Sequence, residues 1–173
     1  SGRCGGRTII PPKNLRARPT TDFAKENLFN VLGNMIDFED LEVLDLFAGT
    51  GSISYEFASR GAAAVTSVEI NAVHYNFIRS TAKTFGFDNL HPVKANAFLY
   101  LKSCTKQFDV IFSDAPYDLE GIENIIDLVF ENNLLKDDGI FIFEHSKSKD
   151  YSDNPHFKQL RSYGSVQFSI FEK

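Results

Sequence analysis

The stretch that decides the fold is Leu44-Asp45-Leu46-Phe47-Ala48-Gly49-Thr50-Gly51. It ends a strand predicted over residues 43–47 and leads into a helix predicted over 52–60. The two glycines let the backbone turn sharply and approach a ligand closely, because they carry no Cβ. The N–H groups at the start of the helix favour a carboxylate or a phosphate. Asp45 is placed to face an ammonium group, so the loop suits an amino-acid moiety better than a pyrophosphate.

Two other kinds of glycine-rich loop are excluded. A dinucleotide-binding loop requires a third glycine where this chain has Ser54. A P-loop requires a lysine and a hydroxyl residue directly after its last glycine, and neither follows Gly51 in that pattern. A purely structural turn between strand and helix remains the alternative.

Polar side chains follow the next two predicted strands, which cover residues 64–70 and 91–95. Glu69 lies 18 residues after Gly51, where an acid accepts hydrogen bonds from ribose hydroxyls. Asn96 follows the third strand and is placed to reach the amino group of an adenine, although asparagine is equally typical of a turn. The sequence therefore predicts a nucleoside site in which Ile70 and Ala97 neighbour these two polar residues.

Strands and helices alternate through the middle of the chain. Further strands are predicted over 108–113 and 139–144, and further helices over 72–85, 97–102 and 120–131. Continuous apolar strands that alternate with helices indicate a parallel sheet covered on both faces. Two last strand-like runs, 158–163 and 165–172, join through Gly164 and predict an antiparallel hairpin. We therefore expect a Rossmann-like α/β fold with a mostly parallel, seven-stranded sheet.

The first 20 residues differ from the rest in charge and composition. Arg7 to Ile10 form a β-like stretch among glycines and prolines, which predicts a short hairpin or extended arm. Residues 1–30 carry six basic residues against two acidic ones, whereas the whole chain has a net charge of −5. A basic arm on an acidic body is expected where one end meets phosphate; a merely solvated tail is the alternative. We divide the chain into an arm, 1–20, and one domain, 21–173, whose first helix is capped near Thr21.

The fourth predicted strand runs directly into Asp114-Ala115-Pro116-Tyr117. In a doubly wound sheet the carboxyl ends of the first and fourth strands flank the ligand crevice, so this loop should face the glycine loop. Asp114 and the carbonyl of Ala115 can accept the two N–H groups of an exocyclic amine on a nucleic-acid base, which stabilises the charge that builds on nitrogen during methylation. Tyr117 offers a ring on which an extruded base can stack.

With these motifs the chain resembles the bacterial ribosomal RNA small-subunit (guanine-N2) methyltransferase D family, which belongs to the class I methyltransferases. The resemblance runs essentially from end to end. It includes Ser1-Gly2 with Gly6-Arg7, the segment 15–22, Glu26 to Asn30, the glycine loop and residues 58–62. It implies S-adenosylmethionine as the cofactor and a guanine of small-subunit RNA, within an assembled particle, as the substrate. The implied cofactor contacts are Asp45, Phe47, Ala48, Gly49, Thr50, Gly51, Glu69, Ile70, Asn96 and Ala97. The implied catalytic residues are Asp114, Ala115, Pro116 and Tyr117.

The resemblance also implies that Arg16, Arg18, Thr20 and Thr21 lie over the site and position RNA. Two positions depart from the family pattern: Ala115 stands where a proline is usual, and Asn96 where an acid is usual. The first keeps the main-chain acceptor, and the second keeps an acceptor without its charge. We therefore expect weaker cofactor binding and the same cofactor.

Other functions remain open on the sequence. An adenine-N6 DNA or RNA methyltransferase uses the same Asp-x-Pro-Tyr chemistry, although no separate module for reading DNA sequence is present. A non-catalytic RNA-binding assembly factor is the alternative from a different class. Glu144-His145, at the end of the fifth strand, is interpreted as a structural, hydrogen-bonded pair rather than a substrate contact.

The composition of the chain bears on its localisation, on membrane insertion and on metal binding. The chain is 43% hydrophobic and contains 17 phenylalanines, and no apolar run approaches the roughly 20 residues that cross a bilayer. Cys4 and Cys104 form no CxxC, and the histidines are scattered, so we expect two reduced thiols and no metal site. No signal peptide is visible. These features predict a cytoplasmic protein, and we expect a monomer.

Overall fold

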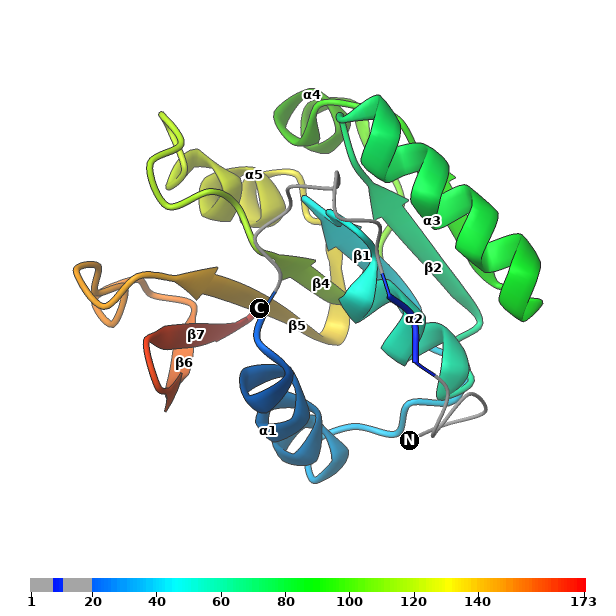
Figure 1. The fold of residues 1–173 in the computed structure, drawn as a ribbon. Coiled ribbons are helices and arrows are strands. Elements are labelled where there is room, and N and C mark those ends of the chain that lie inside the picture. Colours follow the sequence, from blue (N-terminus) through cyan, green and yellow to red (C-terminus); the bar gives the residue numbers. More distant parts are fainter. Residues whose placement is uncertain (1–7, 11–19) are drawn as a thin grey trace.

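A single seven-stranded sheet organises the structure, a computed structural model that describes residues 8–10 and 20–173. The strand order is β3-β2-β1-β4-β5-β7-β6 (Figure 1). The first five strands are parallel: β1 (Glu42–Leu46), β2 (Ala64–Val68), β3 (Leu90–Val93), β4 (Phe108–Ser113) and β5 (Leu135–His145). The last two are antiparallel: β7 (Val166–Glu172) pairs with β5, and β6 (Phe157–Tyr163) forms the edge. The predicted sheet with its terminal hairpin is confirmed.

Helices cover both faces of the sheet, as predicted. The first face carries α1 (Asp22–Gly33), α2 (Ser52–Ser59) and α3 (Ala72–Phe85). The second carries α4 (Ala97–Ser103) and α5 (Asn124–Glu131). Successive strand residues alternate between the two cores: Val43 packs with the first set of helices and Leu44 with the second. Both residues are fully buried, which is why these strands have continuous apolar sequences.

The order of the strands in the sheet determines where the ligand crevice lies. Because β1 lies between β2 and β4, the chain crosses to opposite sides after β1 and after β4, and a crevice opens between the carboxyl ends of these two strands. Leu46 pairs with Ser113 at these ends. The glycine loop and the loop that begins at Asp114 therefore start side by side.

The boundary of β5 differs from the prediction. The strand begins at Leu135, and not at Gly139, because the pairing with β4 shifts between Phe108 and Val110. The shift accommodates the polar residues 136–139, which have the composition of a turn. A Cβ at Gly139 would lie 2.9 Å from the carbonyl oxygens of Lys136 and Phe108, so this bulge requires glycine. The helix expected from residue 120 likewise begins later, at Asn124, after turns.

The expected N-terminal hairpin lies mostly outside the described residues. Residues 8–10 form no strand, in contrast to the β-like stretch predicted from Arg7 to Ile10. Ile9 packs against the core of the first face, while Ile10 is exposed. The first helix begins where predicted: Thr21 is its N-cap and accepts a hydrogen bond from the Ala24 N–H at 3.2 Å. Within the described ranges, no helix has the length and apolar character needed to span a bilayer.

Candidate functional site

The glycine loop turns through three residues with positive φ. These are Phe47 at 56°, Gly49 at 59° and Gly51 at 91°. Gly51 is the N-cap of α2, and a Cβ there would lie 2.5 Å from Cζ of Tyr55, one turn further along the helix. Both the backbone conformation and the ring behind it therefore exclude a side chain at this position.

Glu69 fastens the glycine loop to the loop after β2. One carboxylate oxygen accepts the Gly49 N–H at 2.8 Å, and the other accepts the Asn71 N–H at 2.7 Å. Glu69 is only 8% exposed. A carboxylate oxygen can accept more than one hydrogen bond, so Glu69 keeps the capacity to bind the ribose hydroxyls predicted for it.

Asp45 lies at the floor of the site and is 1% exposed. The Ser54 hydroxyl donates to it at 2.6 Å and is itself 2.6 Å from the Ser67 hydroxyl. Burial, the largest cause, raises the pKa of Asp45 to about 7; the Ser54 hydrogen bond opposes this rise and the charge of Glu69 adds to it. Neither serine was predicted from the sequence as a partner of this carboxylate.

These loops enclose a pocket of about 530 Å³, within the range of small-molecule sites. Nine of the ten predicted cofactor residues line it: Asp45, Phe47, Ala48, Gly49, Thr50, Glu69, Ile70, Asn96 and Ala97. The exception is Gly51, which is buried behind the loop and does not line the pocket. The lining residues that sequence reasoning missed are Ser52, Ile53, Val68, Asn71, His74, Ala95, Phe98, Phe112 and Leu119. Of these, Ser52, Asn71 and Phe98 directly follow predicted site residues in the chain, and that adjacency was the available signal.

Asn96 has a second role beside the predicted one. It is the N-cap of α4, and its Oδ1 accepts the Leu99 N–H at 3.1 Å. The acceptor expected to reach an adenine amino group is therefore shared with the helix cap. The neighbouring rings of Phe47 and Phe98 meet edge to face, with centroids 6.4 Å apart, and form an apolar part of the pocket wall.

The loop after β4 contributes only part of its predicted residues to the pocket. Asp114 and Pro116 line it. Ala115 is fully buried and packs into the core of the second face. Tyr117 is half-buried and does not line the pocket. The structure thus brings the Asp114 carboxylate to the same pocket as the glycine loop.

The residues predicted to meet RNA divide into three groups. Arg16 and Arg18 lie outside the described residues. Thr21 is exposed and caps α1. Thr20 lines the pocket and is 6% exposed; its hydroxyl lies 2.7 Å from Oε1 of Glu144 and 3.3 Å from Oδ2 of Asp114.

Glu144 and His145 bond to different neighbours. Glu144 accepts from Thr20, whereas the ring of His145 bonds to Ser169 at 2.7 Å and to the Ser146 carbonyl at 2.9 Å. Both residues are buried. His145 therefore has the structural role expected of it, while Glu144 borders the site.

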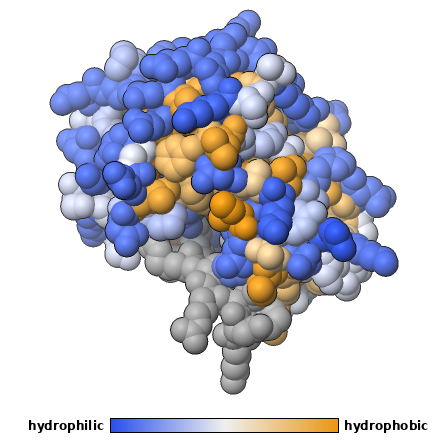
Figure 2. Space-filling view, turned by 90° about the horizontal axis from the view of Figure 1, so that it is seen from above, coloured by the Kyte–Doolittle hydropathy of each residue, from blue (hydrophilic) through white to orange (hydrophobic). Residues whose placement is uncertain are grey.

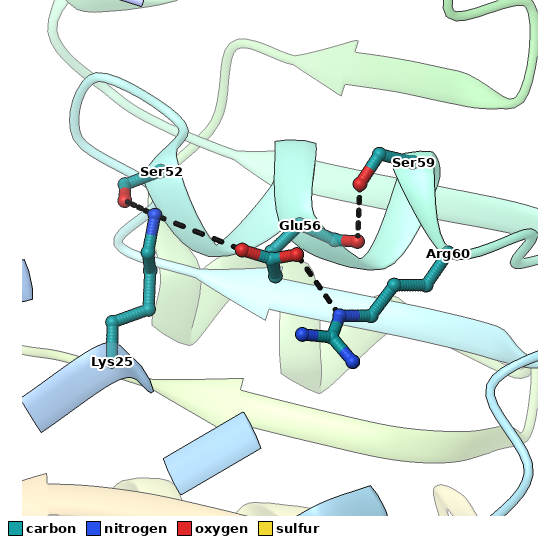
Figure 3. Close-up of polar contacts among 5 residues, drawn as sticks. All are labelled: Lys25, Ser52, Glu56, Ser59 and Arg60. Carbon is teal, nitrogen blue, oxygen red and sulfur yellow. Dashed lines mark hydrogen bonds and ion pairs between the residues drawn. The ribbon is translucent and has the colours of Figure 1, made fainter. Parts of the chain in front are cut away.

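A polar network joins α1 to the wall of the pocket (Figure 3). Lys25 Nζ lies 3.2 Å from the hydroxyl of Ser52, a pocket residue, and 4.0 Å from Oε1 of Glu56. Arg60 donates to the other oxygen of Glu56 at 2.9 Å. The first helix is thereby held against the start of α2.

On the face that Figure 2 shows, hydrophobic residues gather in the middle and hydrophilic residues surround them. Three exposed apolar residues lie at the starts of α3 and α4: Ile70, Val73 and Leu99 are 60%, 51% and 64% exposed. Ile70 lines the pocket. Ile70 thus adds an exposed apolar side chain to a pocket that also holds the buried carboxylates of Asp45 and Glu69. Among the described residues, no cluster of histidine, cysteine and carboxylate side chains could hold a metal ion.

Comparison with known proteins gives several relatives that match most of the chain. A Haemophilus influenzae protein named ribosomal RNA small subunit methyltransferase D is 35% identical over 178 residues, which covers 99% of this chain and 91% of that protein. An Escherichia coli protein of the same name is 34% identical over 144 residues, covering 83% and 71%. One from Buchnera aphidicola is 33% identical over 140 residues, covering 81% and 70%.

Solved structures and a family match agree with these relatives. A putative methyltransferase from Escherichia coli superposes with a TM-score of 0.87 and 27% identity, covering 100% of this chain and 95% of that one. A putative methylase from Haemophilus influenzae gives 0.74 and 30% identity, covering 87% and 96%. The family described as Conserved hypothetical protein 95 matches residues 1–172. The chain therefore belongs to that family, together with the proteins named ribosomal RNA small subunit methyltransferase D.

Proposed function

We propose that this chain transfers a methyl group from S-adenosylmethionine to the exocyclic N2 amine of a guanine in small-subunit ribosomal RNA. The observation that carries the proposal is the meeting of the Asp114 carboxylate and the glycine loop in one pocket. The names of the relatives support the reaction and the RNA class. The choice of guanine N2 rests on the resemblance of the motifs.

The pocket fits the cofactor group by group. Asp45 supplies a carboxylate for the ammonium group, and Glu69 supplies one for the ribose hydroxyls. The start of α2, at Ser52, favours the carboxylate. Ile70, Phe47 and Phe98 offer apolar surface to the adenine. When bound, S-adenosylmethionine supplies an electrophilic methyl group.

The loop after β4 acts on the amine. An amine on a base is a poor nucleophile because its lone pair is delocalised into the ring, and positive charge builds on nitrogen as it is methylated. In our proposal Asp114 accepts one N–H of the amine and the Ala115 carbonyl accepts the other, which stabilises that charge. Pro116 stiffens the turn at the rim, and Tyr117 offers its ring to the extruded base, a contact of about 1–3 kcal/mol.

The basic N-terminal segment would hold the RNA. Arg16 and Arg18 precede Thr20, which lies in the pocket, so a contact of these arginines with phosphate would fall near the site. Thr21 follows Thr20 directly and is exposed. We further propose that the substrate is presented in an assembled small subunit and that a monomer acts on it in the cytoplasm.

Methylation of ribosomal particles tests the proposal. Small subunits from cells that lack this enzyme are incubated with the protein and methyl-labelled cofactor, and the labelled nucleoside is identified after digestion. We expect N2-methylguanosine at a single position. N6-methyladenosine would replace the proposal with the adenine alternative, and no transfer with retained RNA binding would replace it with an assembly factor.

A pair of variants tests the role of Asp114. Asp114→Ala should lower kcat by about two to three orders of magnitude, while the Kd for S-adenosylhomocysteine changes less than about threefold. Asp118→Ala is the matched control, because Asp118 is exposed in the same loop and does not line the pocket. Full turnover by Asp114→Ala would remove this residue from the mechanism.

A further inference from the structure

Thr20 occupies an unusual position between two carboxylates. Its hydroxyl lies 2.7 Å from Oε1 of Glu144 and 3.3 Å from Oδ2 of Asp114. These partners are 124 and 94 residues away in the chain. The contact therefore joins three separate segments: the residue before the α1 cap, the end of β5 and the loop after β4.

Burial makes this arrangement a fixed part of the site. Thr20 is 6% exposed and Glu144 is 1% exposed, so little water competes for these hydrogen bonds. Thr20 lines the same pocket as Asp114 and the glycine loop. A hydroxyl carries a single proton, and an ionised carboxylate can only accept. The shorter distance makes Glu144 the main acceptor of that proton, and Asp114 accepts the weaker branch of the same shared hydrogen bond.

We propose that Thr20 and Glu144 are positioning residues for Asp114 in methyl transfer. The hydroxyl of Thr20 holds the Asp114 carboxylate at the pocket wall. Glu144 fixes the orientation of this hydroxyl through the shorter hydrogen bond, so the hydroxyl stays directed toward Oδ2 of Asp114 as well. The inference rests on the proposed function, because it assigns a task to the residue that is proposed to bind the amine.

This role differs from the RNA contact expected of Thr20 from the sequence. A side chain that positions Asp114 affects the rate after the substrate is bound, whereas a side chain that binds RNA affects KM. A purely structural side chain affects stability and neither kinetic constant specifically. The three roles therefore give different results in one set of measurements.

Two variants of Thr20 form the test. Thr20→Val removes the hydroxyl at nearly constant shape and should lower kcat by about ten- to a hundredfold, with the KM for small subunits and the Kd for S-adenosylhomocysteine within about threefold of wild type. Thr20→Ser keeps the hydroxyl and should recover kcat to within about threefold. Thr81→Val is the control: Thr81 is also 6% exposed but lies on α3 and does not line the pocket.

The outcomes separate this inference from the proposed function. If the wild type does not methylate small subunits, the proposed function fails first. If the wild type is active and Thr20→Val matches Thr81→Val in kcat, the positioning role is overturned. If Thr20→Val raises only the KM for small subunits, Thr20 acts in RNA binding, and the positioning role is also overturned. Should Thr20→Val not fold, Thr20→Ala decides: a lower kcat with an unchanged KM and an unchanged Kd for S-adenosylhomocysteine supports the role, and an unchanged kcat refutes it.

Discussion

The affinity of this protein for its cofactor should depend on pH through Asp45. Burial raises the pKa of this carboxyl to about 7, and a cationic ammonium group prefers the ionised form. If binding requires that form, the apparent Kd rises as the ionised fraction falls. The fraction is about 90% at pH 8 and about 10% at pH 6 for a pKa near 7, so affinity should weaken roughly tenfold, or about 1.4 kcal/mol, between these values.

Ionisation of Asp45 should also change the stability of the free protein, in the opposite direction from its effect on cofactor affinity. The pKa of Asp45 in the folded chain lies above its ordinary value of 3.8, so protonation favours the folded state. The free protein should therefore lose stability as the pH rises from about 4 through 7. A bound ammonium group offsets this loss, so the rise in melting temperature on adding ligand should grow from pH 6 to pH 8.

Titration calorimetry with S-adenosylhomocysteine, which keeps the ammonium group, measures the effect at several pH values. Asp45→Asn should bind more weakly at pH 8 and show a flat pH profile. His74 also lines the pocket, so His74→Gln is the matched control and should keep the slope. An unchanged Kd between pH 6 and 8 in the wild type, or a slope that survives Asp45→Asn, would refute the reasoning.

Three further predictions concern the loop, the adenine site and the arm. Gly51→Ala places a Cβ 2.5 Å from the Tyr55 ring at a φ of 91° and should cost roughly 2–4 kcal/mol, seen as a lower melting temperature; a melt identical to the wild type would contradict it. Asn96→Asp adds an oxygen acceptor for the adenine amino group while the other oxygen caps α4, so S-adenosylhomocysteine should bind about five- to tenfold tighter, and calorimetry showing no gain would count against an adenine contact. Arg16→Glu with Arg18→Glu should weaken small-subunit binding by at least tenfold at low salt and leave cofactor Kd unchanged; a larger effect on the cofactor would remove the arm from RNA binding.

Features with local signals could be predicted from the sequence. The glycine loop, the order of strands and helices and the terminal hairpin all follow from short apolar runs separated by glycine, proline and asparagine. The cap at Thr21 is equally local. These patterns sufficed for the fold. The family resemblance of the same motifs implied the ten cofactor contacts, and nine of those residues line the pocket.

Features that depend on distant partners were missed. Residues 136–139 have the composition of a turn, yet they lie within β5 because the register with β4 shifts there. Ser67 supports Asp45 through Ser54 from a neighbouring strand, and no spacing in the chain predicts that hydrogen bond. Thr20 meets Glu144 only because the folded sheet brings the end of β5 beside it.

The Glu69 carboxylate holds the glycine loop and the loop after β2 together. This one side chain accepts a backbone N–H from each loop, so neither loop can be remodelled alone without losing one of the two hydrogen bonds. Anyone redesigning the pocket for an altered cofactor should treat the glycine turn and the stretch after β2 as one inseparable unit. The protein itself, through the two oxygens of Glu69, holds the two loops in register.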